Sequence, residues 1–174
     1  MKTRSCFIFL VVITVLLRST VLFAQNNFTK SKVKAKVAIY NVMDYGQHIV
    51  IKNEGNILYN RKPNYKSNEL SMSGLDLAVG QLEISKMIKN AFKSKNISVL
   101  NTIPNLALTL IVLPTGQIKE ISFYLPKNIN LNSEDIEVIE KIVKKIQIKV
   151  LKPELYINID FIPISMVLRS RDLR

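Results

Sequence analysis

The stretch that most constrains the fold is residues 105–125, which has the pattern of a β-hairpin. Residues 105–113 read NLALTLIVL, a run that is apolar at most positions. Pro114-Thr115-Gly116 follows, and this is turn chemistry, because proline presets φ and glycine accepts a positive φ. Residues 118–125 then alternate apolar and polar side chains, as a strand with one buried face does. The sequence therefore predicts two antiparallel strands joined by a tight turn.

Two segments that flank this hairpin have the periodicity of amphipathic helices. In residues 75–93, apolar side chains recur at spacings of three, four and seven, and Ser73 stands at a plausible N-cap position. Residues 133–147 begin with acidic and end with basic side chains, which suits the helix macrodipole. The second segment has the apolar stripe Ile136, Ile139, Val143 and Ile146, and the i,i+4 pairs Glu137–Lys141 and Glu140–Lys144. We expect a helix in each segment.

A third strand is predicted at residues 155–162, where apolar and polar side chains alternate again. If it pairs with the central strand, the spatial order is 117–125, 105–113, 155–162. The fold class is then α+β, with an antiparallel sheet of three or more strands and two helices. The central strand is apolar on both sides, so we expect Ile111 to be buried, covered by the N-terminal strands or by a second copy of the chain.

The region before the first helix is rich in β-prone residues. Residues 33–41 are typical of a strand, with Val33, Ala35 and Val37 facing one way. Two further β-prone runs flank Asn53-Glu54-Gly55, which predicts a hairpin that turns there. The sequence leaves open whether residues 33–59 join the main sheet or pair with the edge formed by residues 155–162.

Three parts are predicted along the chain, with the polar loop at residues 60–74 as the best candidate boundary. They are a signal peptide at residues 1–24, a basic β-rich extension at residues 25–68 and an α+β domain at residues 69–174. In the first part, two basic residues precede an apolar run of twelve, which Arg18 interrupts. A membrane span needs about 20 apolar residues, so we expect cleavage near Ala24 and a periplasmic or secreted protein. A retained anchor is the alternative.

The formal charge of the chain is +12, and the excess is greatest just after the signal segment. Lys30, Lys32, Lys34 and Lys36 alternate there, close to several tyrosines. Because exported proteins rarely meet nucleic acid, we expect no nucleic-acid partner. Electrostatic contact of these four lysines with an anionic envelope surface is a possible role.

The residues needed for catalysis are scarce. His48 is the one histidine, and Cys6 falls in the signal segment, so we expect no catalytic residue, metal or cofactor. A small exported hydrolase that uses carboxylate, histidine and tyrosine side chains is the alternative. Clustering of Asp44, Glu54 and His48 in a cleft would favour it.

Residues 75–165 resemble the C-terminal domain of the TonB energy transducers. The resemblance rests on NLALTLIVLPTGQIKEISFYLPKNINLNSEDIEVIEKIVKKIQ and on the later YINIDFIPI. Gly116 holds the turn position, and residues 118–123 resemble the G-x-I-x-x-V strand of that family. The resemblance implies a helix, a hairpin, a second helix and a final strand that binds partners. An anchored TonB-like transducer is a further alternative.

These observations predict a non-catalytic protein-binding or structural module of a bacterial cell envelope. Residues 155–162 are expected at a sheet edge, where main-chain donors and acceptors can add a strand from a peptide or protein partner. The expected protein-binding residues are Tyr156, Asn158, Asp160 and Ile162.

Overall fold

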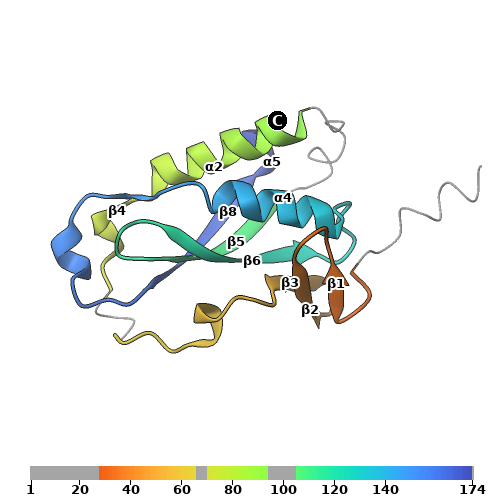
Figure 1. Cartoon of the computed structure of the whole chain (residues 1–174). Coiled ribbons are helices and arrows are strands. Elements are labelled where there is room, and N and C mark those ends of the chain that lie inside the picture. The colour runs from red at the N-terminus through yellow and green to blue at the C-terminus, as the bar shows by residue number, and fades with distance from the viewer. Residues whose placement is uncertain (1–27, 66–69, 94–104, 174) are drawn as a thin grey trace, which may run out of the picture.

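The structure, a computed structural model, describes residues 28–65, 70–93 and 105–173 (Figure 1). Its centre is a six-stranded antiparallel sheet in the order β1-β2-β3-β6-β5-β8. The strands are β1 (Lys32–Lys34), β2 (Ile39–Tyr45), β3 (His48–Asn53), β5 (Asn105–Val112), β6 (Ile118–Pro126) and β8 (Ile162–Arg169). The short strands β4 (Leu75–Asp76) and β7 (Lys149–Val150) pair separately. The predicted α+β class and antiparallel sheet are confirmed.

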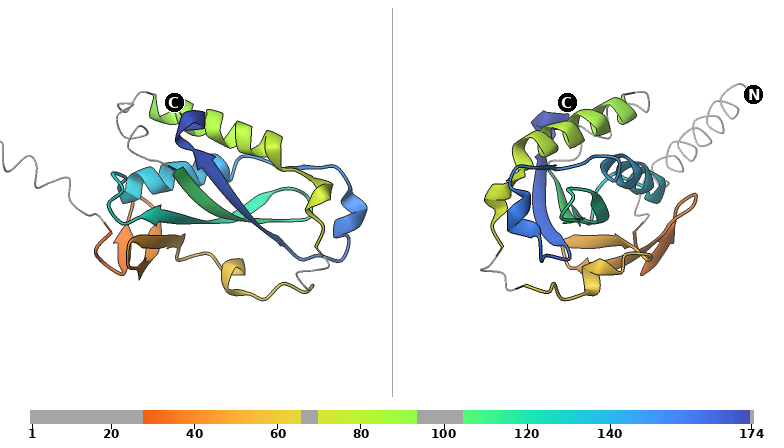
Figure 2. Two further views of the ribbon diagram at one scale, coloured as in Figure 1. Left: turned by 180° about the vertical axis from the view of Figure 1, so that it is seen from behind. Right: turned by 60° about the vertical axis from the view of Figure 1, so that its left-hand side comes forward.

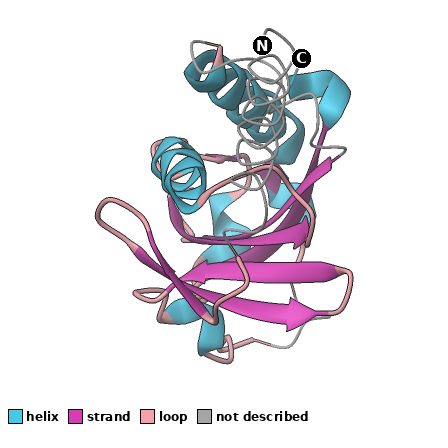
Figure 3. Ribbon diagram, turned by 90° about the vertical axis from the view of Figure 1, so that its right-hand side faces the viewer, coloured by secondary structure: helices cyan, strands magenta, loops and turns pink. Residues whose placement is uncertain are grey.

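The helices cover one face of the main sheet. α2 (Leu77–Phe92) and α4 (Ser133–Val143) lie on this side, and the chain after β3 crosses the other side (Figures 1 and 2). The short α5 (Ser170–Leu173) follows β8 and packs against α2. The core between the helices and the sheet includes Tyr40, Ile51, Leu108, Phe123, Ile164, Ile84, Ile88, Ile136 and Ile139, each at most 2% exposed. Figure 3 shows the helices and the strands in separate layers.

The two long helices, α2 and α4, each begin with a side-chain cap. At α4, Asn132 and Asp135 form a capping box, in which each side chain accepts the other residue's amide. The α4 stripe is buried as predicted. α2 begins later than expected, because Leu75 and Asp76 pair with β7. Asp76, rather than Ser73, is therefore its N-cap, and its side chain accepts from the amide of Val79 at 3.2 Å.

The central hairpin is confirmed, with its turn at Gly116. That residue has a φ of 87°, and a Cβ there would lie 2.0 Å from the Ile148 carbonyl oxygen, so both conformation and space require glycine. β5 lies between β6 and β8, and Ile111 is 3% exposed, as expected. β6 is not an edge, because β3 pairs with its other side. Residues 32–53 thus extend the main sheet at the end opposite β8.

The strand predicted at residues 33–41 is interrupted by a turn. The amide of Ala35 donates to the Ala38 carbonyl at 2.9 Å, and β1 and β2 pair on either side of this turn. Val33 and Ala35 are buried, but Val37 is 79% exposed and does not share their face. The carboxylate of Glu137 on α4 accepts the amides of Val37 and Ala38 at 3.0 and 3.5 Å. A contact this distant in sequence leaves no trace in the local pattern.

The N-terminal hairpin turns at Gly46 and not at residues 53–55. Gly46 has a φ of 79°, and its amide donates to the Asp44 side chain at 2.9 Å. Asn53 does begin a turn, since its side chain accepts from the amide of Gly55 at 2.9 Å. The chain then forms the 3₁₀ helix η1 (Leu58–Asn60) instead of a strand.

The last strand is Ile162–Arg169 and not residues 155–162. Pro153 opens the 3₁₀ helix η4 (Pro153–Tyr156), so the alternating pattern predicted there is not a strand. β8 nevertheless pairs with β5 along its whole length. The predicted order of the three C-terminal strands is therefore correct, and β8 is an edge of the main sheet.

Candidate functional site

None of the side chains predicted to bind a partner is exposed on the sheet edge: Ile162, the first residue of β8, is buried, and the other three precede this strand. The Tyr156 side chain is 1% exposed, and its hydroxyl donates to the Ser71 carbonyl at 2.6 Å. Ile162 is buried in the core. Asn158 and Asp160 precede β8 and contact Asn64, whose side-chain amide donates to the Asn158 carbonyl at 2.7 Å and accepts from the Asp160 amide at 3.2 Å. This corrects the placement of Tyr156, Asn158, Asp160 and Ile162.

The edge that β8 does form is partly blocked. The carbonyl of Val167 accepts a hydrogen bond of 2.9 Å from the Gln81 side chain on α2, so it points away from β5. Main-chain groups alternate sides along an antiparallel strand, which places the Pro163 nitrogen on the same outer side. Proline has no N–H, so one donor is missing and one acceptor is occupied. The free part of the edge lies between Pro163 and Val167 and is centred on Ser165.

The side chains of the alternative hydrolase site do not come together. Asp44 pairs with Lys127, and this hydrogen bond, with that from the Gly46 amide, lowers the pKa of Asp44. Glu54 lies beyond the opposite end of β3 and pairs with Lys32. His48 instead stacks on Tyr124, with ring centroids 4.8 Å apart and planes inclined by 14°.

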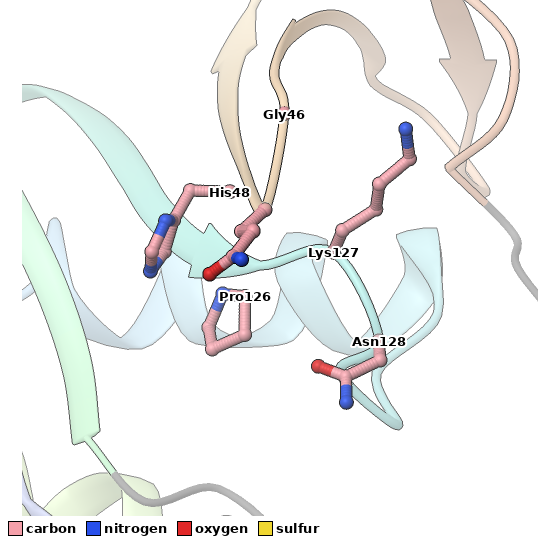
Figure 4. Close-up of a pocket in the computed structure, with 6 residues that line it drawn as sticks. Gly46, His48, Pro126, Lys127 and Asn128 are labelled. Atoms are coloured by element: carbon pink, nitrogen blue, oxygen red, sulfur yellow. The ribbon is translucent and has the colours of Figure 1, made fainter.

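A shallow pocket of about 480 Å³ lies beside His48 at the β2–β3 turn (Figure 4). Its lining residues are Gly46, Gln47, His48, Pro126, Lys127 and Asn128, and they include no carboxylate. In the part of the chain that the structure describes, no group of three histidine, cysteine or acidic side chains could hold a metal ion. The lining of the pocket therefore offers His48 no orienting acid.

Two buried carboxylates on α4 join the helix to the N-terminal strands. Glu140 accepts from the Tyr40 hydroxyl at 2.5 Å, the Asn53 side chain at 3.1 Å and Lys144 at 2.6 Å. Burial, helped by the hydrogen bond to Glu140, raises the pKa of Tyr40. The predicted pair with Lys144 is confirmed, but Glu140 is 4% exposed rather than solvated. This glutamate holds β2 and the end of β3.

Glu137 does the same for the β1–β2 turn. The hydrogen bond from Lys141, followed by that from the Val37 amide, lowers the pKa of Glu137 to about 2. Its side chain is 5% exposed, whereas that of Lys141 is 60% exposed. The predicted ion pair between Glu137 and Lys141 is confirmed. The buried carboxylates of α4 are therefore explained by the contacts that they make within the fold.

A third buried carboxylate, Glu120, fixes the chain that crosses the helix-free side. Its two oxygens accept from the amides of Ile57, Leu58 and Tyr59 at 2.7, 2.8 and 2.8 Å. Because Glu120 pairs with Ile111 in the sheet, η1 lies against this end of the face. The Lys52 ammonium lies 5.0 Å from the centre of the Tyr59 ring. Residues 56–60 therefore form a wall beside the remaining surface.

The rest of this side, which no helix of the described residues covers, is a partly exposed sheet surface that we call the open face. The sheet register aligns an apolar row across five strands: Met43, Val50, Tyr124, Ala107 and Val167. Tyr124 and Val167 are 47% and 49% exposed. A parallel row is polar: Asn41, Lys52, Ser122, Thr109 and Ser165. Both rows, together with Tyr59, contribute to a groove of about 300 Å³.

Two cationic side chains lie at the open face. Lys52 faces it from β3, Arg169 is exposed at the end of β8, and the imidazole ring of His48 also faces it from β3. Neither aligned row contains a carboxylate, and the nearby Glu120 is occupied by three amides. The groove is thus an apolar and aromatic surface with cationic groups at its margins.

The lysines of residues 30–36 are exposed but partly paired. Lys32 pairs with Glu54, and Lys36 lies 3.7 Å from Glu134. Lys30 and Lys34 are also exposed. The alternation of residues 118–125 predicts a strand with one buried face, but it does not reveal the open face. The groove depends on β3 and β8, whose positions the sequence did not reveal.

No family model matches this sequence, and no curated protein is significantly similar to it. The fold is similar to the crystal structure of a DUF5043 family protein from Bacteroides uniformis, with a TM-score of 0.61. The two sequences are 16% identical, and the match covers 83% of this chain and 88% of that one. At this identity the likeness establishes a shared α+β fold. No helix in the described segments is long and apolar enough to cross a membrane.

Proposed function

We propose that this chain is a non-catalytic binding module of the cell envelope, which holds an extended segment of a partner protein on its open face. One observation carries the proposal: the sheet register aligns five apolar side chains in a row that none of the helices described in the structure covers. Aromatic and apolar groups that remain exposed together commonly mark an interaction site. Export rests on the basic, apolar and small residues at positions 1–24.

The chemistry of the groove favours an acidic segment. Tyr124 and Val167 supply apolar contact, while Ser165 offers a hydroxyl and the free main-chain groups of the β8 edge. Arg169 and His48 are placed to meet carboxylates of the segment. Extended peptides bind sheets by this combination, in which main-chain bonds give affinity and alternate side chains give selectivity. The proposal keeps the protein-binding role predicted from sequence, but places it on a different surface.

Site-specific photocrosslinking in the native cell tests this role. A photoreactive benzoylphenylalanine replaces Tyr124, and a control carries it at Val37, which is 79% exposed on the β1–β2 turn. We expect position 124 to give a discrete adduct whose crosslinked segment is rich in Asp and Glu. The absence of an adduct, or identical adducts from both positions, would contradict the proposal.

A further inference from the structure

Exposed aliphatic side chains gather at a second place, which is not part of the open face. Leu151, Leu155 and Ile157 are 50%, 40% and 77% exposed within seven residues. We call residues 151–157 the aliphatic tip; it forms one end of the molecule in Figure 1. The pairing of β4 with β7 brings the start of α2 beside it. There Val79 and Leu82 add exposed fractions of 53% and 69%.

The tip is held rigidly outward. Tyr156 is buried beneath it against Gly74, where a Cβ would lie 2.6 Å from the tyrosine hydroxyl. The carbonyl of Gly74 accepts from the amides of Leu151 and Lys152 at 2.7 and 3.3 Å. These contacts bury the one aromatic ring of the tip and leave its aliphatic side chains in solvent. An apolar surface held in this way loses little conformational entropy when it binds.

The charges beside the tip favour an anionic surface. Lys152 is exposed on the tip and Lys149 just before it, against the exposed carboxylate Glu154 and the half-buried Asp76, which lies opposite Lys149 in the β4–β7 pair. Val79 and Leu82 lie on one face of α2, and the same face continues with three exposed lysines. Glu83 is an exposed acidic side chain near them. These lysines are Lys86, Lys89 and Lys93. The aliphatic groups are thus bordered by an excess of positive charge.

The residue types distinguish a lipid surface from a protein partner. Protein interfaces are enriched in Tyr, Trp and Arg and depleted in Lys. The tip shows the reverse, with exposed Leu and Ile next to lysines. Lysine stems can lie along apolar surface while their ammonium groups stay at the headgroups of a bilayer. Leucine side chains and lysines together are typical of segments that rest in a membrane interface.

We infer that the aliphatic tip inserts Leu151, Leu155 and Ile157 into the interface of an anionic bilayer, with Lys149 and Lys152 at the phosphate groups. The inference is independent of the open face and of the partner proposed for it. It describes peripheral contact and needs no membrane-spanning helix.

A polarity-sensitive fluorophore on the tip tests this contact locally. In the full chain with Cys6→Ser, a nitrobenzoxadiazole label is attached through Ile157→Cys, or through Ile57→Cys as a control. Ile57 is 71% exposed on the segment that crosses the helix-free side. The probes are vesicles of phosphatidylcholine with or without phosphatidylglycerol. We expect emission at position 157 to rise at least about twofold and shift to the blue with anionic vesicles, and to be quenched by spin-labelled acyl chains.

The control label and one double charge-reversal variant complete the test. Position 57 should not respond, and Lys149→Glu with Lys152→Glu should lower the vesicle-bound fraction at position 157 by about tenfold or more. All labelled proteins are the full chain with Cys6→Ser. Any contribution of residues 1–24 to vesicle binding is therefore the same in every sample. No response at position 157 would overturn the inference. So would a response without lipid that grows with protein concentration, because that outcome identifies a second copy as the occupant.

Discussion

Phe123 and Tyr124 are neighbours in β6, yet they belong to two different surfaces. Phe123 is fully buried under the helices, whereas Tyr124 is 47% exposed on the open face. The alternation of a β-strand places them on opposite sides. One face of the sheet therefore packs against the helices, and the other presents a row of partly exposed apolar side chains. Single substitutions along one strand can therefore separate the two roles.

The largest expected difference comes from truncating these two rings. Phe123→Ala removes a fully buried ring and should lower the free energy of unfolding by about 3–5 kcal/mol. Tyr124→Ala should lower it by about 1 kcal/mol or less, because the ring is half exposed and its stacking on His48 is a surface contact. Urea unfolding followed by circular dichroism measures both. Equal losses would mean that the open face is part of the core.

Glu120→Gln should have a smaller effect that is confined to one segment. The substitution removes the charge that accepts three amides of residues 57–59, and we expect a loss of about 1–3 kcal/mol. Hydrogen exchange of those amides should speed up, while exchange in β5 stays slow. Glu83→Gln, on the exposed side of α2, is the matched control. Unchanged exchange at residues 57–59 would show that Glu120 does not hold the segment.

Glu137 predicts a pH dependence of stability. Its pKa is about 2 in the folded chain, below the ordinary value of 4.5. The folded state therefore binds fewer protons, so the stabilisation is present above pH 4.5 and is lost as the pH falls towards 2. Glu137→Gln should be less stable than the unmodified chain at pH 7, and the gap should narrow by pH 2.5. Urea midpoints at pH 7, 4 and 2.5 measure it; a gap that is constant with pH would contradict the assignment.

Asn158→Ala should have the smallest effect. Asn158 was predicted on a binding edge, but its carbonyl, not its side chain, accepts the hydrogen bond from Asn64. The substitution should change stability by less than about 0.5 kcal/mol and leave crosslinking at position 124 unaltered. A clear loss of the adduct would return the binding surface to residues 155–162.

The parts of the fold that follow local rules were predictable. The turn at Gly116, the apolar strand β5 and the stripe of α4 depend on neighbouring residues, and each is observed. The errors fall where distant contacts decide the structure. Glu137 holds the turn that interrupts residues 33–41, and Tyr156 under Gly74 fixes residues that alternate like a strand. For the same reason the open face could not be predicted, because it exists only once β3 and β8 take their places beside β6 and β5.

The central claim is that the open face binds an acidic segment, and charge reversal at its margin tests this most directly. Arg169→Glu changes a residue at the end of β8, and Lys34→Glu makes the same change on the exposed side of β1. The measurement is the adduct yield from benzoylphenylalanine at position 124 in each background, with unfolding midpoints as a check on folding. We expect Arg169→Glu to lower the yield about tenfold and Lys34→Glu to leave it unchanged. Equal yields in the two variants would contradict the account.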